Sequence, residues 1–270
     1  MRIVILGGDA RTPHAAHALR EKGHEVTVTA HEEAPLSPEA LSHAEAAVLP
    51  LPLSRDGVHL NAPLSPLTVP LGPLFSMLPE GIPLLFGREE DAAAVAPHSH
   101  PLLFYGTRED FLVKNSLLTA EGAISLLSGR LPTALSETPC MILGSGRLAR
   151  ALLDLLRGLH APVTVVARRP DPLPGGVRPI PLGALPAELP RFPVVLNTVP
   201  VRLLDPPLLA RAREGAILLD LSSLPPPTPA EAARYPGLTL ITAPSLPGRY
   251  APVSSGRAVA DAVTALLPPP

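Results

Sequence analysis

The stretch that most constrains the fold is residues 140–149, where an apolar run stops at a glycine turn and continues as a helical pattern. The turn reads Gly144-Ser145-Gly146-Arg147-Leu148-Ala149, a G-x-G-x-x-A pattern. The first glycine allows the tight turn, the second lets a pyrophosphate approach the backbone, and the alanine lets helix and strand pack closely. The N–H groups and positive dipole end of the helix would then face the phosphates. The sequence therefore predicts a dinucleotide site here, the alternative being a plain strand–turn–helix connection.

Composition excludes several classes of function. The net charge is −2 and no basic block occurs, so nothing favours binding to nucleic acid or to a membrane. The single cysteine, Cys140, excludes an intrachain disulfide and a multi-cysteine metal site. The histidine pairs 14/17 and 98/100 lack a third ligand in a recognisable spacing, so we expect no metal. The chain opens directly into a strand pattern and has no apolar run of about 18 residues, so we expect a cytoplasmic protein.

The N-terminal part repeats the strand–turn–helix–strand order, but with different chemistry in the turn. Strand 2–6 is followed by Gly7-Gly8-Asp9-Ala10-Arg11, helix 13–22 and strand 25–29. Asp9 would repel a pyrophosphate at this place. We therefore interpret Asp9 and Arg11 as substrate-binding residues, with the turn offering N–H groups and Arg11 to a carboxylate. The alternative is that Asp9 caps the helix and Arg11 is solvated.

An amphipathic helix is predicted over residues 108–130, and we expect it to link two domains. Its polar residues Lys114, Asn115, Thr119 and Glu121 are candidates for catalysis, either orienting substrate or moving a proton. Lys114 is one of two lysines in a chain with 20 arginines, which hints that a compact, titratable ammonium is needed. A solvated surface role remains the alternative for Lys114 and Glu121.

The pattern as a whole predicts an α/β protein of two domains, each a mainly parallel sheet with flanking helices. Residues 1–113 form the N-terminal flavodoxin- or Rossmann-like substrate domain, and 114–136 the linking helix and linker. Residues 137–252 form a Rossmann NAD(P)-binding domain. The helical run 253–267 is a candidate to pack back on the first domain.

The strand 163–167 ends in Arg168-Arg169, near the position where NAD-specific folds carry an acidic residue for the ribose 2′-hydroxyl. Guanidinium groups fit a 2′-phosphate, so we predict NADP, with NAD possible through Asp171 and plain surface arginines as the remaining alternative. Further polar loops follow predicted strands ending near residues 196, 221 and 242. The cofactor-binding candidates are Gly144, Ser145, Gly146, Arg147, Leu148, Arg168, Arg169, Asn197, Thr198, Val199, Pro200, Asp220 and Ser222, with Ser223 beside them.

Four segments together resemble the family of the dipicolinate synthase A subunit, the sporulation enzyme of Bacillus-like and clostridial bacteria. They are Gly7-Gly-Asp-Ala-Arg11; Asn115-Ser with Thr119-x-Glu121-Gly122; Gly144-Ser-Gly-Arg147 with Asn197-Thr-Val-Pro200; and Leu246-Pro-Gly-x-x-Ala-Pro252. The resemblance implies a two-domain NAD(P)-dependent oxidoreductase that forms dipicolinate from the dihydrodipicolinate-pathway intermediate. It also implies that the partner is the flavoprotein-like B subunit of dipicolinate synthase, and we expect a homo-oligomer.

Cations are needed for a dicarboxylate substrate, and Arg11, Lys114 and Arg249 are the candidates. The chain departs from the family pattern near the expected reaction centre: Leu224-Pro-Pro-Pro-Thr replaces Pro-Gly-Gly with an acidic residue, Val253-Ser254 replaces Lys-Thr, and Asn115-Ser-Leu-Leu replaces Asn-Ser-x-Pro. Two alternatives therefore stay open. One is a non-catalytic dinucleotide-binding subunit of that complex, and the other is a shikimate-dehydrogenase-like two-domain NADP oxidoreductase.

Overall fold

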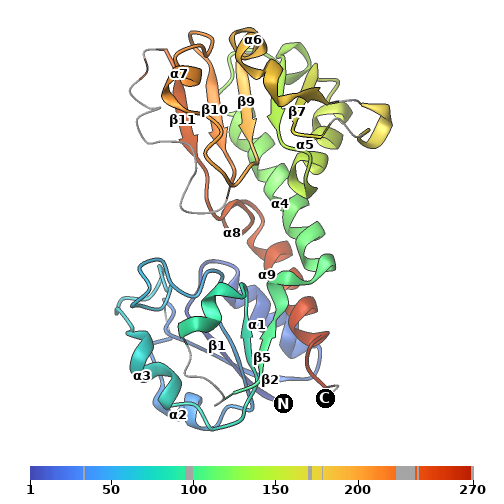
Figure 1. Ribbon diagram of the computed structural model, residues 1–270. Helices are drawn as coiled ribbons and strands as arrows, with labels where there is room; N and C mark the ends of the chain where they lie inside the picture. The colour runs from blue at the N-terminus through green and yellow to red at the C-terminus, as the bar shows by residue number, and fades with distance from the viewer. Residues whose placement is uncertain are drawn as a thin grey trace. The chain divides into compact units, whose positions relative to one another are not determined.

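The computed structural model describes residues 1–32, 34–94, 100–169, 172–177, 179–222, 235 and 237–268 of the 270-residue chain. It divides into two compact units, which Figure 1 shows as two sheets with flanking helices. Unit 1 comprises Met1–Asn115 and Pro247–Pro270, and unit 2 comprises Ser116–Leu246. The chain therefore leaves unit 1 inside a helix at residue 115 and returns to it at residue 247. The α/β class predicted from the sequence is confirmed.

The sheet of unit 1 has five parallel strands in the order β2-β1-β3-β4-β5. The strands are β1 Arg2–Leu6, β2 Glu25–Thr29, β3 Ala46–Val48, β4 Leu84–Phe86 and β5 Leu102–Phe104. In this flavodoxin-like order, successive strands are added on one side of β1 up to β2 and on the other side from β3 onward, so β1 and β3 flank a switch point. Open α/β sheets bind ligands at the carboxyl ends of the strands at such a point.

Both faces of this sheet are covered by helices. They are α1 Thr12–Glu21, α2 Pro38–Ser42, α3 Leu71–Ser76, α9 Pro252–Thr264 and the start of α4 Glu109–Ser128. The short helix α8 Leu246–Tyr250 directly precedes α9. Side chains of β1 alternate between the two faces: Ile3 and Ile5 pack with α1 and α9, whereas Val4 and Leu6 pack with α2 and α3. Burial on both faces explains why β1 is continuously apolar from residue 3 to 6.

The sheet of unit 2 has six parallel strands in the order β11-β10-β9-β6-β7-β8. The strands are β6 Cys140–Leu143, β7 Val163–Ala167, β8 Ile180–Pro181, β9 Val194–Asn197, β10 Ile217–Asp220 and β11 Thr239–Thr242. Counted from β6 and read from the other edge, this is the 3-2-1-4-5-6 order of dinucleotide-binding folds, with the switch point between β6 and β9. Helices α4 and α5 Arg147–Gly158 pack on one face, and α6 Leu185–Glu188 and α7 Pro206–Leu209 on the other.

The long elements predicted from periodicity are present, including the helix predicted at 108–130, which is α4. The sequence predicted that residues 114–136 form a linking helix and linker between the two domains. In the structure, α4 is divided between the two units, with its residues up to Asn115 in unit 1 and those from Ser116 in unit 2. The sequence did not predict α8, because Pro247 and Gly248 hide a helix from propensity arguments. The final helix, α9, packs along α1 within unit 1. Among the described helices, none is long and apolar enough to cross a membrane.

Candidate functional site

The glycine turn of unit 2 connects β6 to α5. Gly144 has a φ of +111°, and a Cβ at this position would lie 2.5 Å from the Thr198 hydroxyl oxygen. Thr198 is held there because its hydroxyl donates a hydrogen bond of 2.7 Å to the Leu143 carbonyl oxygen. The neighbouring strand end therefore fixes the turn, and a side chain at position 144 would be strained and crowded.

Gly146 precedes the first residue of α5 and leaves the end of this helix open. Among the residues that the structure describes, a Cβ on Gly146 would meet no atom within 4 Å, and no side chain caps α5. The first turn of α5 contains no acidic residue. The N–H groups of a first helical turn lack intrahelical partners, and the helix dipole favours an anion beside them. Ala149 is fully buried, so α5 packs closely on the sheet. These residues fit the diphosphate of a dinucleotide.

Asn197 and Asp220 lie beside this turn at the carboxyl edge of the sheet. Asn197 is in register with both Leu143 and Asp220. Asp220 is 1% exposed and accepts hydrogen bonds from the Asn197 side-chain amide at 3.3 Å and from the N–H and hydroxyl of Ser222 at 3.1 and 2.5 Å. These groups bond to one another and hold residues 198–199 after β9 and 221–222 after β10 in place. Val199, whose N–H donates to Asn197 at 3.1 Å, and the exposed Pro200 continue this edge.

Arg168 and Arg169 follow β7 and are both exposed. Val166 of β7 is in register with Leu143, so the arginines reach the same edge of the sheet as the glycine turn. Ser145, Arg147 and Leu148 belong to that turn and the start of α5. Asp171 and Ser223 lie outside the described residues, as does His98. Within the described part of the chain, no three histidine, cysteine or acidic side chains are placed to hold a metal ion.

In unit 1, three N–H groups of the corresponding turn already have protein partners. Gly7 donates to the carbonyl oxygen of Thr29 and Gly8 to that of Asn61, each at 2.9 Å. The Arg11 N–H donates to the Asp9 carboxylate at 3.1 Å. Three of the N–H groups that were candidates for binding a substrate carboxylate are therefore engaged within the protein.

Asp9 and Arg11 form a two-point ion pair, with Nε–Oδ1 and Nη2–Oδ2 distances of 2.8 and 3.0 Å. Burial raises the pKa of Asp9, but the hydrogen bonds and charge of Arg11 outweigh it and leave that pKa below its usual value. Burial lowers the pKa of Arg11, and Asp9 more than compensates. Arg11 is 9% exposed, so the alternative that it is solvated is wrong. A Cβ on Gly248 would lie 2.7 Å from the Asp9 carboxylate, which therefore packs against the backbone of α8.

The four candidates on α4 lie on two sides of this helix. Successive residues of an α-helix are rotated by about 100°, so Lys114 and Glu121 share one side while Asn115 and Thr119 share another. Lys114 and Glu121 are exposed, and the other two are partly buried. Lys114 and Asn115 are in unit 1, whereas Thr119 and Glu121 are in unit 2. The four side chains therefore do not converge on one point of the helix surface.

Lys114 lines a cleft between α4 and α9 together with Ser254 and Arg257, which sequence reasoning missed. Ser254, Arg257 and Asp261 are spaced three and four residues apart, which places them on one polar side of an amphipathic helix. This spacing was the signal in the sequence that could have identified Ser254 and Arg257. Arg249, the remaining substrate-binding candidate, is exposed on α8.

Two doubly wound parallel sheets, one with a glycine turn at its switch point, define a Rossmann-type protein with the fold of two-domain dehydrogenases. The NAD-dependent formate dehydrogenase of Staphylococcus aureus, solved in complex with NAD, shares the fold. It is 13% identical, the alignment covers 98% of this chain and 94% of that chain, and the TM-score is 0.55.

Within this class, residues 2–96 match the family model described as the N-terminal domain of the dipicolinate synthase A subunit. The corresponding A subunit from Bacillus subtilis is 27% identical over 182 residues, which are 66% of this chain and 61%, less than two thirds, of that relative. The crystal structure of the dipicolinate synthase A subunit from Bacillus halodurans is 23% identical, with a TM-score of 0.85, and covers 99% of this chain and 98% of that chain. The resemblance to the A subunit of dipicolinate synthase is confirmed.

Proposed function

We propose that this protein is an NAD(P)-dependent oxidoreductase that converts the dihydrodipicolinate-pathway intermediate to dipicolinate. The observation that carries the proposal is the Gly144–Ala149 turn at the switch point of a 3-2-1-4-5-6 sheet. The open helix end above Gly146 suits the diphosphate, and the exposed Arg168 and Arg169 suit a ribose 2′-phosphate. NADP is therefore proposed over NAD. The resemblance to the dipicolinate synthase A subunit supports the choice of reaction.

The reaction removes one hydride and one proton from a dihydropyridine dicarboxylate, and the ring becomes aromatic. The oxidised nicotinamide, when bound, supplies the acceptor for the hydride. The protein must hold a dianion and receive a proton. Lys114, Asn115, Thr119 and Glu121 are proposed for orientation and proton transfer, and Lys114 and Arg249 for charge. The Asp9–Arg11 pair is proposed to hold the β1 turn against α8, because its own charges compensate each other.

The flavoprotein-like B subunit of dipicolinate synthase, implied by the resemblance, is proposed as the partner of this chain. Assembly as a homo-oligomer and a cytoplasmic location remain part of the same proposal.

The cofactor assignment is tested by titrating the purified protein with NADPH and NADH and following nucleotide fluorescence. Saturable binding with preference for NADPH is expected, and no binding of either nucleotide contradicts the proposal. A Gly146→Asp variant should lose binding, because a carboxylate would stand where the diphosphate approaches.

Catalysis is tested separately with the product of the lysine-pathway synthase, NADP⁺ and this chain as the sole added protein. Formation of dipicolinate and NADPH in equal amounts is expected. Nucleotide binding without turnover, restored once the B subunit is supplied, would instead identify a dinucleotide-binding subunit.

A further inference from the structure

A cleft of about 460 Å³ lies in unit 1 between the first turns of α4 and the outer side of α9. The lining residues are Asp110, Phe111, Lys114, Ser254, Arg257, Ala258, Asp261 and Ala262. Its volume lies within the roughly 300–1,000 Å³ typical of small-molecule sites. None of these residues belongs to the dinucleotide site of unit 2, so the cleft needs an explanation of its own.

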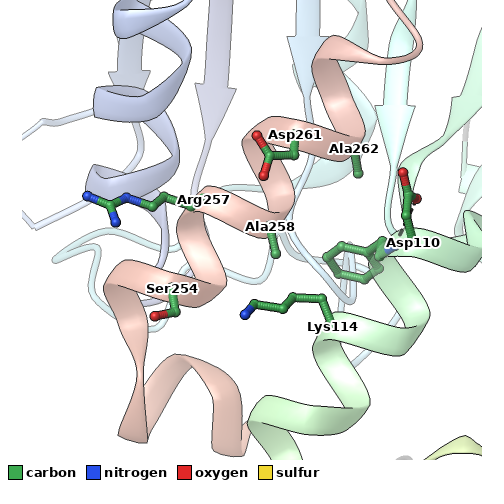
Figure 2. Close-up of a pocket in the computed structure, with 8 residues that line it drawn as sticks. Asp110, Lys114, Ser254, Arg257, Ala258, Asp261 and Ala262 are labelled. Carbon is green, nitrogen blue, oxygen red and sulfur yellow. Dashed lines mark hydrogen bonds between the residues drawn. The ribbon is translucent and has the colours of Figure 1, made fainter.

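The charges around the cleft leave an excess of positive charge. Asp110 is paired with Arg108 at 2.8 Å, and Asp261 with Lys22 at 2.9 Å. In the part of the chain that the structure describes, neither Lys114 nor Arg257 forms an ion pair. The two acids are thus compensated by other cations, and the charges of Lys114 and Arg257 are left uncompensated among the described residues. Figure 2 shows the Arg257 guanidinium extending away from Lys114, which places this charge at the rim of the cleft.

The rest of the lining is apolar or weakly polar. Phe111 and the two alanines of α9 also line the cleft, and because these residues are buried they form its apolar floor. Figure 2 shows Lys114 extending from α4 towards α9, where Ser254 and Ala258 stand on the facing helix. Arg257 lines the cleft from α9 as well. Cations, a hydroxyl and apolar walls together suit a ring compound that carries carboxylates.

We propose that this cleft binds the aromatic dicarboxylate of the reaction, with Lys114 and Ser254 on one carboxylate and Arg257 at the rim for the other. The identity of the ligand rests on the proposed function. Ser254 and Arg257 thereby join Lys114 as substrate-binding residues. Arg257 takes the place of Arg11 as a cation for the substrate, because the charge of Arg11 is already compensated by Asp9.

The test uses the rarity of lysine in this chain, whose only lysines are Lys22 and Lys114. Full-length protein labelled with ¹³C-lysine gives two sets of side-chain signals, which a Lys114→Met variant assigns. Pyridine-2,6-dicarboxylate is titrated without nucleotide. The Lys114 signals should shift in a saturable way, with much smaller shifts for Lys22. Pyridine-2-carboxylate and inorganic phosphate should bind more weakly.

Calorimetry on variants measures the contribution of each cation. Lys114→Met should weaken binding of the dicarboxylate about tenfold or more, since a hydrogen bond to a charged group is lost. Arg257→Gln should weaken it about two- to threefold, as expected for an exposed cation. Lys114→Arg should retain most of the affinity, and Arg55→Gln, an exposed unit 1 arginine outside the cleft, should have no effect.

Unchanged affinity in Lys114→Met, equally tight binding of phosphate, or absence of dicarboxylate binding to the wild-type protein overturns the inference. None of these results depends on nucleotide. Failure of the proposed cofactor would appear only in the separate NADPH and NADH titrations, so the two outcomes can be told apart.

Discussion

At the carboxyl edges of the two sheets, charged residues differ in what they can still bind. Asp9 and Arg11 satisfy each other by two hydrogen bonds and are largely buried. Arg168 and Arg169 follow β7 and are exposed. A buried pair contributes a fixed shape with little net charge, whereas an exposed guanidinium can still meet a phosphate. Asp9 and Arg11 therefore have a structural role, whereas Arg168 and Arg169 are available to bind a ligand.

Replacing Arg168 with Asp should change the nucleotide preference of unit 2. A carboxylate repels a 2′-phosphate but accepts a hydrogen bond from a 2′-hydroxyl. We expect the ratio of NADPH to NADH affinity to fall at least about tenfold, or about 1.4 kcal/mol, as measured by fluorescence titration. Arg213→Asp, an exposed arginine of the same unit, serves as control, and an unchanged ratio in Arg168→Asp would remove the 2′-phosphate assignment.

His24 should make unit 1 sensitive to acid. It is 4% exposed, and among the described residues neither ring nitrogen has a hydrogen-bond partner. Burial, followed by the positive charges of the N-terminus and Lys22, lowers the pKa of His24 below its ordinary value. As the pH falls, His24 therefore takes up a proton in the unfolded chain before it does so in the folded protein, and this protonation favours unfolding. The contribution of neutral, buried His24 to stability is complete above about pH 6.5 and is lost as the pH falls below it.

Urea unfolding at pH 7.5 and pH 5.0 tests this. His24→Leu should lose less stability between the two pH values than the wild type does. His17→Gln, which alters an exposed histidine of α1, should keep the wild-type difference. A wild-type difference in His24→Leu would mean that other groups cause the acid sensitivity.

At the scale of elements, glycines decide how closely helices and strands approach. The Gly144 turn fits against Thr198 because no side chain intervenes, and Gly256 allows α9 to contact α1 backbone to backbone. A Cβ on Gly256 would lie 2.7 Å from both the Ala15 nitrogen and the Arg11 carbonyl oxygen. The end of a flexible side chain could rotate away from an added Cβ, but these backbone atoms cannot. A side chain at position 256 would therefore force α9 and α1 apart.

Gly256→Ala should therefore destabilise the protein by roughly 1–3 kcal/mol, the usual cost of overpacking. The matched control is Gly158→Ala in α5, where a Cβ would meet no atom of the described residues within 4 Å. That change should be neutral or stabilising by up to about 1 kcal/mol, because alanine is the better helix former. Denaturant unfolding measures both, and equal effects of the two substitutions would contradict the close contact between α1 and α9.

At the scale of the whole molecule, unit 1 is completed by the C-terminal end of the chain. Helix α9 contributes Ala258, Val259, Ala260, Ala262 and Val263 to the same buried cluster as β1 and α1. The N-terminal 115 residues therefore depend on a segment that follows all of unit 2 in the sequence. The stability of β1 and α1 therefore depends on the packing of α9.

Val263→Asp should disturb unit 1 selectively. Val263 is fully buried, and an unpaired carboxylate there should cost more than about 3 kcal/mol. Hydrogen exchange with mass spectrometry should show lost protection in β1 and α1 but not in β6 and α5. Val253→Asp, at an exposed position of the same helix, should leave both regions protected. Equal loss of protection in both units would contradict separate units.

The sequence by itself determined the strands other than β8, and the long helices, because their apolar periodicity records which side chains are buried on one or both faces. It also determined the glycine turn of unit 2, since the pattern and its flanking strand and helix are local features. The tertiary structure alone decided that Arg11 is compensated by Asp9, and it decided which residues of α9 pack on β1 and α1, where the sequence had only made this helix a candidate to return to the first domain. It alone placed Ser254 and Arg257 beside Lys114. These contacts join residues 2 to more than 250 positions apart, and whether a charge is paired depends on which side chains the fold brings within hydrogen-bond distance, which no local pattern encodes.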